Sequence, residues 1–447
     1  MRIQKYNGSK FRQVDVDPTK IYQSSTWKSL NIIDPADYMA SDGAHQNFYP
    51  RIMYPHALYN SGQNKTVMVY QNEDMNPTII EYNHTSKSWS TAYVIGSNEL
   101  SEEHDSHGGP VIYHDTSGYY HVFYGAHSFN TTGLKHTKSD SANDISSFTE
   151  QTLLAGDIEY PKIFKVADGT IYLFLEQEFS RSIYYKSTDE CDTWSDAVTY
   201  CEFDYTYSHQ EYGNIVYDDV NERFHKIFGC RYPDGDPNLD YGHNRNVYYM
   251  YMDIATERWY NSDGVRLKVD CEDETLVWGS GNYCNHYVVG DVHCQSGKVY
   301  AIAPSVDTTD CSSVSEILEN VTVPRFIYFD GSGWTVTTPF PEHKNVSAVA
   351  NMRVLGEDHL QVFLFYLRID SSYDATHGGN VEEWEYYNGE WTYVRTVLSM
   401  SESTKFYGRS CIVKDGLEEL MWFFDENHDT GGTATKIFAY GDRGFVS

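Results

Sequence analysis

The feature of this sequence that most constrains its fold is a plan of about 50 to 70 residues that recurs along the chain. Each copy opens with a polar or aromatic residue and continues as an apolar strand, a turn with Asp, Asn or Gly, and two further strands. The copies begin at 48–51, 106–110, 159–162, 211–214, 285–287, 350–353 and 406–409. One such unit cannot bury both faces of its sheet, so the copies must pack around a common axis. We therefore expect an all-β chain that forms a seven-bladed β-propeller.

The tyrosine content agrees with an all-β chain. Of the 447 residues 39 are Tyr, and aromatic residues make up 15% of the chain. Aromatic side chains fit the pleated, half-buried surfaces of strands. No stretch is apolar over the roughly 20 residues that a spanning helix needs, so we expect no membrane insertion. We assign residues 41–447 to the propeller and residues 1–40 to an arm, which is either an outer strand that latches the ring or a separate attachment segment.

The charge balance restricts the partners. Acidic residues outnumber basic ones 64 to 33, for a formal net charge of −31. Because phosphate backbones are bound by basic faces, nucleic acid is excluded as a partner, whereas a local basic pocket for an anion is not. The N-terminus lacks the apolar core of a standard signal peptide. Residues 5–11 and 20–27 resemble short segments at the start of phage tail and other virion proteins, and we expect an extracellular or virion-associated location.

One outer turn carries a known structural motif. Residues 187–194 match the Asp-box pattern S-x-D-x-G-x-T-W, except that Cys191 stands in place of Gly. The Ser and Asp side chains of this motif bond turn amides, and its Trp packs between sheets. A looser copy consists of residues 248–253, Trp259 and residues 263–264. The motif is structural and not catalytic.

These features resemble the bacterial neuraminidase repeat, and residues 107–264 resemble the propeller-type polysaccharide lyases, the ulvan lyases above all. The resemblance implies β-elimination on an anionic, uronate-containing polysaccharide, which can be sulfated. Such a lyase removes the proton alpha to a carboxylate and expels the glycosidic oxygen. An Arg can pair with the substrate carboxylate, and His or Tyr can take or give the protons.

The blade alignment brings candidate catalytic residues together at one end of the ring. His107, Tyr160 and Tyr212 stand at strand starts, and His127 and Arg231 at the ends of second strands. The resemblance implies that His107 and Tyr212 are acid and base, with the two roles exchangeable. It also implies that Arg231 neutralises the carboxylate and that His127 orients the substrate. As substrate-binding residues we name Tyr160, Arg245, Arg51 and Asn72.

A zinc site is the one cofactor that we expect. Cys284 and His286 are alternate residues of one strand and so share a face, where they can grip one ion. His293 follows seven residues later, and at about 3.3 Å per residue it would lie roughly 23 Å away on the same strand. We name His209 and Cys271 as the better companions. The resembled lyases include some with a structural zinc; the alternative is a free buried Cys beside an ordinary His.

Two other functions stay open at this point. The first is glycoside hydrolysis on a sialidase-like fold, for which residues 49–52 offer a faint match to the Arg motif. Ordinary hydrolases use two carboxylates, and the aligned central positions supply few. The second is a carbohydrate-binding propeller without catalysis, such as a receptor-binding protein of a virion. An unsaturated product would separate the lyase from both.

Overall fold

The structure is a computed structural model, and the part of the chain that it describes consists of strands and the turns between them. Described are residues 2–6, 11–15, 40–43, 53–99, 108–125, 127, 133–151, 154–177, 181–202, 211–231, 243–268, 275–279, 283–286, 291–307, 321–341, 343–344, 346–369, 375–377, 380–399, 405–409, 421–427, 435–441 and 444–445. Of some strand residues, among them 230–231, 243–245 and 283–286, only the backbone is described. Within these ranges no helix is long and apolar enough to cross a membrane.

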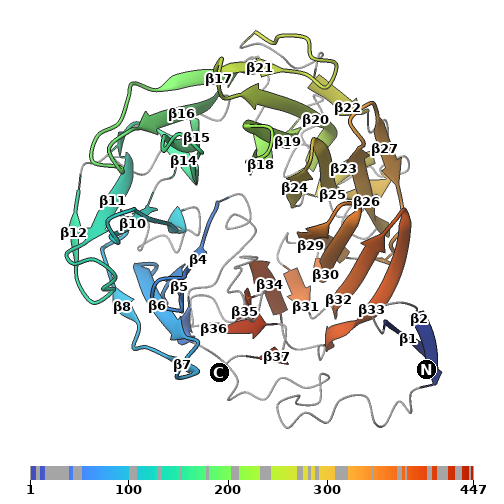
Figure 1. The fold of residues 1–447 in the computed structure, drawn as a ribbon, viewed down its shortest axis with the longest axis horizontal. Helices are drawn as coiled ribbons and strands as arrows, with labels where there is room; N and C mark the ends of the chain where they lie inside the picture. The colour runs from blue at the N-terminus through green and yellow to red at the C-terminus, as the bar shows by residue number, and fades with distance from the viewer. Residues whose placement is uncertain are drawn as a thin grey trace.

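Six antiparallel sheets stand around a central axis (Figure 1). The first holds β4 (Ala57–Asn60), β5 (Lys65–Gln71), β6 (Pro77–Asn83), β7 (Ser88–Trp89) and β8 (Tyr93–Val94). The second holds β9 (Val111–His114), β10 (Tyr120–Tyr124), β11 (Gly133–Ser139), β12 (Phe148–Glu150) and β13 (Leu154–Ala155). The third holds β14 (Ile158–Lys165), β15 (Ile171–Gln177), β16 (Arg181–Ser187) and β17 (Val198–Glu202).

The fourth sheet has 11 strands and continues past the length of a single blade. Its main path runs through β18 (Glu211–Asp218), β19 (Arg223–Arg231), β20 (His243–Asp253), β23 (Tyr283–His286), β25 (Lys298–Asp307), β26 (Val321–Phe329) and β27 (Trp334–Thr337). Four short strands pair at its sides: β21 (Arg258–Tyr260), β22 (Leu276–Trp278), β24 (Val292–Gln295) and β28 (His343–Lys344).

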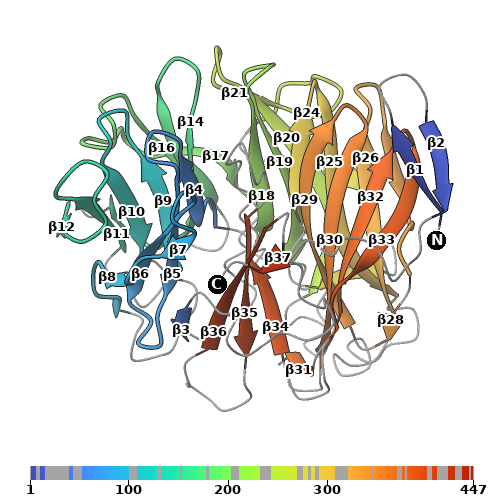
Figure 2. The same ribbon diagram turned by 60° about the horizontal axis from the view of Figure 1, so that its bottom comes forward.

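The last two sheets complete the ring, which Figure 2 shows from a tilted side. The fifth holds β29 (Val346–Gly356), β30 (His359–Ile369), β31 (Ala375–His377), β32 (Asn380–Tyr387) and β33 (Glu390–Ser399). The sixth holds β34 (Lys405–Arg409), β35 (Met421–Asn427), β36 (Thr435–Gly441), β37 (Gly444–Phe445) and the early strand β3 (Ala40–Gly43). The strands β1 (Arg2–Tyr6) and β2 (Phe11–Asp15) pair with each other.

The hydrophobic cores lie between neighbouring sheets, as a propeller requires. One cluster joins residues of the second and third sheets, and the next joins the third and fourth. Aromatic rings make many of these contacts: Phe123 meets Trp194 edge to face at 5.8 Å, and Tyr200 stacks on Trp259 at 4.4 Å. Each blade therefore buries its faces against its neighbours, which explains the abundance of Tyr and Trp.

The Asp-box prediction is confirmed in the turn between β16 and β17. The Ser187 hydroxyl accepts a hydrogen bond from the Cys191 amide, and the Asp189 carboxylate accepts one from the Thr193 amide. Cys191 has a φ of 70°, in the left-handed region that favours glycine, which accounts for the Gly of the motif at this place. Trp194 packs against Phe123 of the neighbouring sheet.

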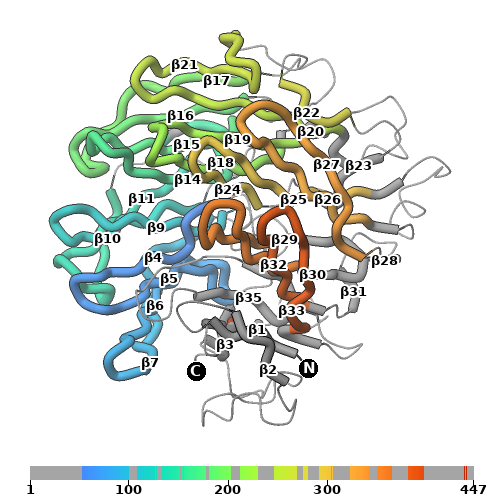
Figure 3. Tube along the Cα trace, turned by 45° about the vertical axis from the view of Figure 1, so that its right-hand side comes forward, coloured from blue at the N-terminus to red at the C-terminus, as the bar shows by residue number. Residues whose placement is uncertain are grey.

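The all-β, propeller-like fold agrees with the expectation, whereas the described residues form six sheets around the axis, so the count of seven blades is not confirmed. The fifth repeat was placed wrongly: residues 285 and 286 of its proposed start fall on β23, which joins β20 to β25, and residue 287 lies outside the described residues. The innermost strand there is β24, which contacts β18 and β29 on either side (Figure 3). At the other end of the chain, β3 pairs with β36, so an early strand joins the sheet of the last strands. The division at residues 40 and 41 stays a prediction.

Candidate functional site

His127 and Glu159 form an ion pair where the inner strand β14 begins. The imidazole Nε2 of His127 lies 3.8 Å from Oε2 of Glu159, and the carboxylate side chain is fully buried while the imidazole is 19% exposed. The pair thus presents a partly exposed imidazole that lies beside a buried carboxylate.

Two buried tyrosines adjoin this pair. Tyr160 follows Glu159 on β14, and Tyr212 is the second residue of β18. Their ring centroids are 6.0 Å apart, with the planes tilted by 54°. Tyr160 has a φ of 56°, and the register of β14 with β15 shifts between Glu159 and Lys162. This bulge re-aims the side chains at the start of β14.

A second buried ion pair supports the same strand. Glu176 stands directly opposite Glu159 in the register of β14 and β15, and like charges in this arrangement repel. The ammonium of Lys162 lies 3.6 Å from Oε1 of Glu176, and both side chains are about 5% exposed. Lys162 and His127 thus offset the two carboxylates, and each Glu is engaged in holding a neighbour.

The backbone register relates the predicted arginine to Tyr212. Tyr212 pairs with Gly229 of β19, and Arg231 is the last residue of that strand. Position 231 therefore lies diagonally across from Tyr212 on the same side of the sheet, a separation that long side chains span. Arg245 of β20 stands opposite Cys230 of β19, whereas Arg231 stands opposite Asn244. Arg231 is the last residue of β19, as predicted, whereas the prediction for His127 is wrong: β10 ends at Tyr124, and His127 lies beyond the strand.

The remaining predicted residues are placed in part. His107, Arg51, His209 and Cys271 lie outside the described residues. Asn72 is 6% exposed, and its Oδ1 accepts hydrogen bonds from the amides of Asp74 and Asn76. This oxygen closes a turn, and the substrate-binding role of Asn72 stays a prediction.

The predicted zinc ligands Cys284 and His286 lie on β23, as alternate residues of one short strand. The prediction that His293 lies on the same strand as His286 is wrong, because His293 belongs to a separate strand, β24. Both strands pair with β25, where Val306 faces Cys284 and Tyr300 faces His293. Six residues of β25 still separate the two points by about 20 Å.

Sequence reasoning missed three features of this region. The buried Glu159 behind His127 gave no signal, since nothing in the sequence predicts the bulge. His243 stands directly opposite His286 in the register of β20 and β23. Asp218, His225 and Cys294 place ligand-type atoms within 4.8 Å of one another.

The axis itself holds a small cavity of about 190 Å³. Residues of β14, β18, β24 and β29 line it, among them Lys162, Asn214, His293 and Asn351. Sites that enclose drug-sized ligands usually exceed about 300 Å³. Among the described residues, this cavity is therefore smaller than the sites that usually enclose a ligand of that size.

Known proteins resemble this chain over almost all of its length. The curated ulvan lyase of Nonlabens ulvanivorans is 24% identical over 457 residues, covering 93% of this chain and 91% of that protein. The ulvan lyase of Alteromonas sp. (strain LOR) is 27% identical over 285 residues, covering 55% of this chain and 56% of that protein. The solved structure of a PL25 ulvan lyase bound to -[GlcA(1-4)Rha3S]- superposes with a TM-score of 0.77 at 18% identity, over 92% of this chain and 96% of that one.

A family description agrees with these likenesses. The model of the BNR repeat-containing family matches residues 57–286, just over half of the chain. The matched range runs from β4 to β23 and so includes the Asp box, His127, the tyrosine pair and Arg231. The chain therefore belongs to the BNR repeat-containing family.

Proposed function

We propose that this protein is a polysaccharide lyase that cleaves ulvan by β-elimination. The observation that carries the proposal is the set of proton-handling groups at one end of the ring: His127 on buried Glu159, beside the Tyr160–Tyr212 pair. The ulvan lyases that resemble the chain over nine-tenths of its length support the same reaction. The extracellular location that we propose follows from the substrate, which is a polymer outside cells.

The reaction divides the work among few groups. In a glucuronate linked through O4, a base takes the C5 proton, the C4–O4 bond breaks, the C4–C5 double bond forms, and an acid protonates the departing oxygen. We assign acid and base to His107 and Tyr212, in either order, and we assign to Arg231 the charge that develops on the carboxylate. A cation beside that carboxylate stabilises the transition state more than the ground state.

His127 orients the substrate in this proposal. Its ring is partly exposed and contacts a buried carboxylate, which orients it, so it can donate an N–H hydrogen bond to an anionic sugar. We also assign Tyr160 and Arg245 to substrate binding: Tyr160 packs against Tyr212, and Arg245 stands opposite Cys230 on β20. The partner is an anionic polysaccharide, in keeping with the -[GlcA(1-4)Rha3S]- unit bound by the PL25 structure.

We also propose that the ring has seven blades. The 11-stranded sheet is long enough for two four-stranded blades, one around β18, β19 and β20 and the other around β24, β25, β26 and β27. β23 bridges them by pairing with both β20 and β25. An experimental structure in which β24 does not stand beside the axis would contradict this count.

A structural zinc at β23 is part of the proposal. Cys284 and His286 share one side of the strand, and the register adds His243 from β20 to that side. Two imidazoles and a thiolate are ligands that zinc accepts, and such an ion would tie β20 to β23 next to Arg245. His209 and Cys271 remain the proposed companions from outside the described residues.

The test of the lyase function is an assay on a panel of uronate polymers that includes ulvan. A lyase yields an unsaturated uronate that absorbs ultraviolet light, in step with new reducing ends. New reducing ends without that absorbance would favour a hydrolase. Binding without either signal would favour a carbohydrate-binding propeller, and either outcome overturns the proposal.

A further inference from the structure

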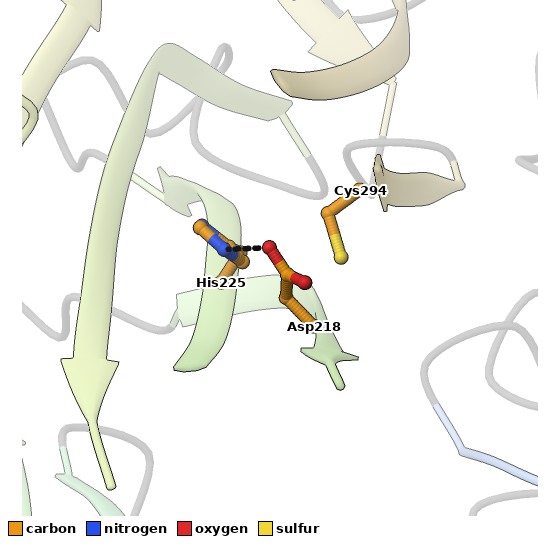
Figure 4. Close-up of side chains that lie close together, drawn as sticks. All are labelled: Asp218, His225 and Cys294. Carbon is orange, nitrogen blue, oxygen red and sulfur yellow. Dashed lines mark ion pairs between the residues drawn. The ribbon is translucent and has the colours of Figure 1, made fainter. Parts of the chain in front are cut away.

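A cluster of three ligand-type side chains lies at the far end of β18 from Tyr212. Asp218 ends β18, His225 lies on the adjacent β19, and Cys294 comes from β24. Asp218 and His225 are each 3% exposed. Figure 4 shows the carboxylate between the imidazole and the thiol, with the three groups turned toward one another. Their ligand atoms all lie within 4.8 Å of one another.

One polar atom of this cluster lacks a hydrogen bond. Nδ1 of His225 lies 2.6 Å from the Tyr249 hydroxyl, which fixes the orientation of the ring. Nε2 of the same ring is buried without a hydrogen-bond partner in the described part of the chain, and Oδ2 of Asp218 lies 3.5 Å from it. In the tautomer that carries its proton on Nδ1, the Nε2 atom of His225 directs a lone pair toward the Asp218 carboxylate and the Cys294 sulfur. A cation between them would satisfy all three.

The second sheet provides a matched contrast. There Asp115 follows β9 and His121 lies on β10, an arrangement like that of Asp218 and His225. Nε2 of His121 lies 3.2 Å from Oδ2 of Asp115, and Nδ1 lies 2.9 Å from His136, so both ring nitrogens are bonded. The Asp–His pair is thus a structural device of the blades. The pair in the fourth sheet differs because Nε2 of His225 lies 3.5 Å from the carboxylate without a hydrogen bond, and the thiol of Cys294 lies within 4.8 Å of both groups.

We propose that Asp218, His225 and Cys294 form a binding site for a divalent transition-metal ion, zinc above all. Thiolate, imidazole and carboxylate together suit zinc better than calcium or magnesium, which prefer oxygen ligands. Tetrahedral zinc with bonds of about 2.0–2.3 Å requires ligand atoms about 3.3–3.8 Å apart. Side-chain movements of about 1 Å therefore suffice to close the site.

The bound ion has a structural role. It ties β18 and β19 to β24 and thereby links the two halves of the 11-stranded sheet on the side of the axis. Asp218 is six residues from Tyr212 along β18, about 20 Å away, so the ion takes no part in the chemistry at the other end. The site is also separate from the zinc proposed at Cys284 and His286, with which it shares no residue.

The test compares metal content among cysteine variants of the full-length chain. Purified without chelator from medium that contains zinc, Cys294→Ser should carry one equivalent of zinc less per chain than the wild type. Cys191→Ser, which removes another buried thiol, should keep the wild-type value. On a Cys284→Ser background the removal of Cys294 should still abolish one equivalent, which distinguishes the two sites.

Thermal stability and turnover provide a second test of the metal site. Zinc at about a hundredfold excess over its dissociation constant should raise the melting temperature of the stripped wild type by about 3 °C more than that of Cys294→Ser. Turnover of Cys294→Ser at low temperature should equal that of the wild type. Equal zinc content in the wild type and Cys294→Ser, or equal melting shifts, would overturn the proposal whatever the enzyme's substrate.

Discussion

The inner strands β14 and β18 both carry a tyrosine near the end at which they begin, but the two strands differ in backbone and burial. On β14 the register shifts after Glu159, and Tyr160 has a φ of 56° and no exposed surface. On β18 the register with β19 is regular, and Tyr212 keeps 8% of its surface exposed. The irregular backbone of β14 positions Glu159 against His127. β18 stays regular, and this regularity sets Arg231 diagonally across from Tyr212.

This difference indicates that β14 and β18 have different functions. A bulge positions groups that support others, whereas a regular strand holds a reacting group in a fixed relation to its cross-strand neighbour. We therefore expect substitutions on the β18 side to remove the chemistry. Substitutions on the β14 side should weaken the hold on the substrate.

The largest effect is expected for Arg231→Ala, which removes the cation from the substrate carboxylate. We expect kcat/KM on ulvan to fall by about 10²–10³-fold, with both kcat and KM affected, because the pairing begins in the ground state and strengthens as charge develops. Arg231→Lys should recover part of the loss, since it restores the charge without the bidentate geometry. An unchanged kcat in Arg231→Ala would remove β19 from the site.

On the β14 side, Glu159→Gln should raise KM by about tenfold and change kcat less. The substitution removes the carboxylate charge beside His127, which orients the ring, while the amide fills the same space. Steady-state kinetics on ulvan fragments measure the split. Glu176→Gln is the control, because Glu176 stands opposite Glu159 on β15 and forms an ion pair with Lys162. A loss confined to kcat would mean that His127 reacts instead of orienting.

Gly213→Ala tests whether β18 tolerates displacement. A Cβ at this position would lie 2.4 Å from Cβ of Phe228 and 2.5 Å from the Ile227 carbonyl oxygen, so the strand must shift. We expect destabilisation of about 1–3 kcal/mol, measured by denaturant unfolding, together with reduced turnover as Tyr212 moves. Gly169→Ala, at a turn with a φ of 92° and no atom within 4 Å of the new Cβ, should cost stability without the same loss of turnover.

The smallest expected effect is a loss of stability at acidic pH, and it arises in the second sheet, next to β14. Burial, with His121 nearby, lowers the pKa of His136 to about 3. From pH 6.5 down to about 3 the unfolded chain binds a proton that the folded chain does not, so stability falls as the pH decreases through this window. Melting temperatures at pH 7.5 and pH 5 should show the fall. His136→Gln, which cannot titrate, should flatten it; a slope as steep as in the wild type would contradict the assignment.

The sequence predicted the local features well, because local chemistry determines them. The Asp box follows from side chains that bond their own turn, and the end of the second strand at Arg231 follows from strand periodicity. The inner strands β14 and β18 begin at Ile158 and Glu211, within two residues of the predicted starts at Tyr160 and Tyr212. Each of these depends on residues within a few positions along the chain.

What the sequence could not predict depends on the ring. The misplaced repeat at residues 285–287 arose because β23 pairs with two different strands, which no local pattern reveals. The contact between His127 and Glu159 requires both the packing of two sheets and the bulge in β14. Asp218 and Cys294 meet because β18 and β24 become neighbours at the axis. Closure of the ring sets these distances.

The assignment of Tyr212 as the reacting tyrosine is tested most directly by comparing Tyr212→Phe with Tyr160→Phe on ulvan. The measurement is the initial rate at which ultraviolet-absorbing unsaturated product forms. The two substitutions each remove one hydroxyl from rings 6.0 Å apart, so they are matched in size and place. Tyr212→Phe should lose about 10²-fold or more in kcat, the scale of general acid–base catalysis, while Tyr160→Phe should stay within about threefold of the wild type. Full activity in Tyr212→Phe with loss in Tyr160→Phe would contradict the assignment and move the reacting tyrosine to β14.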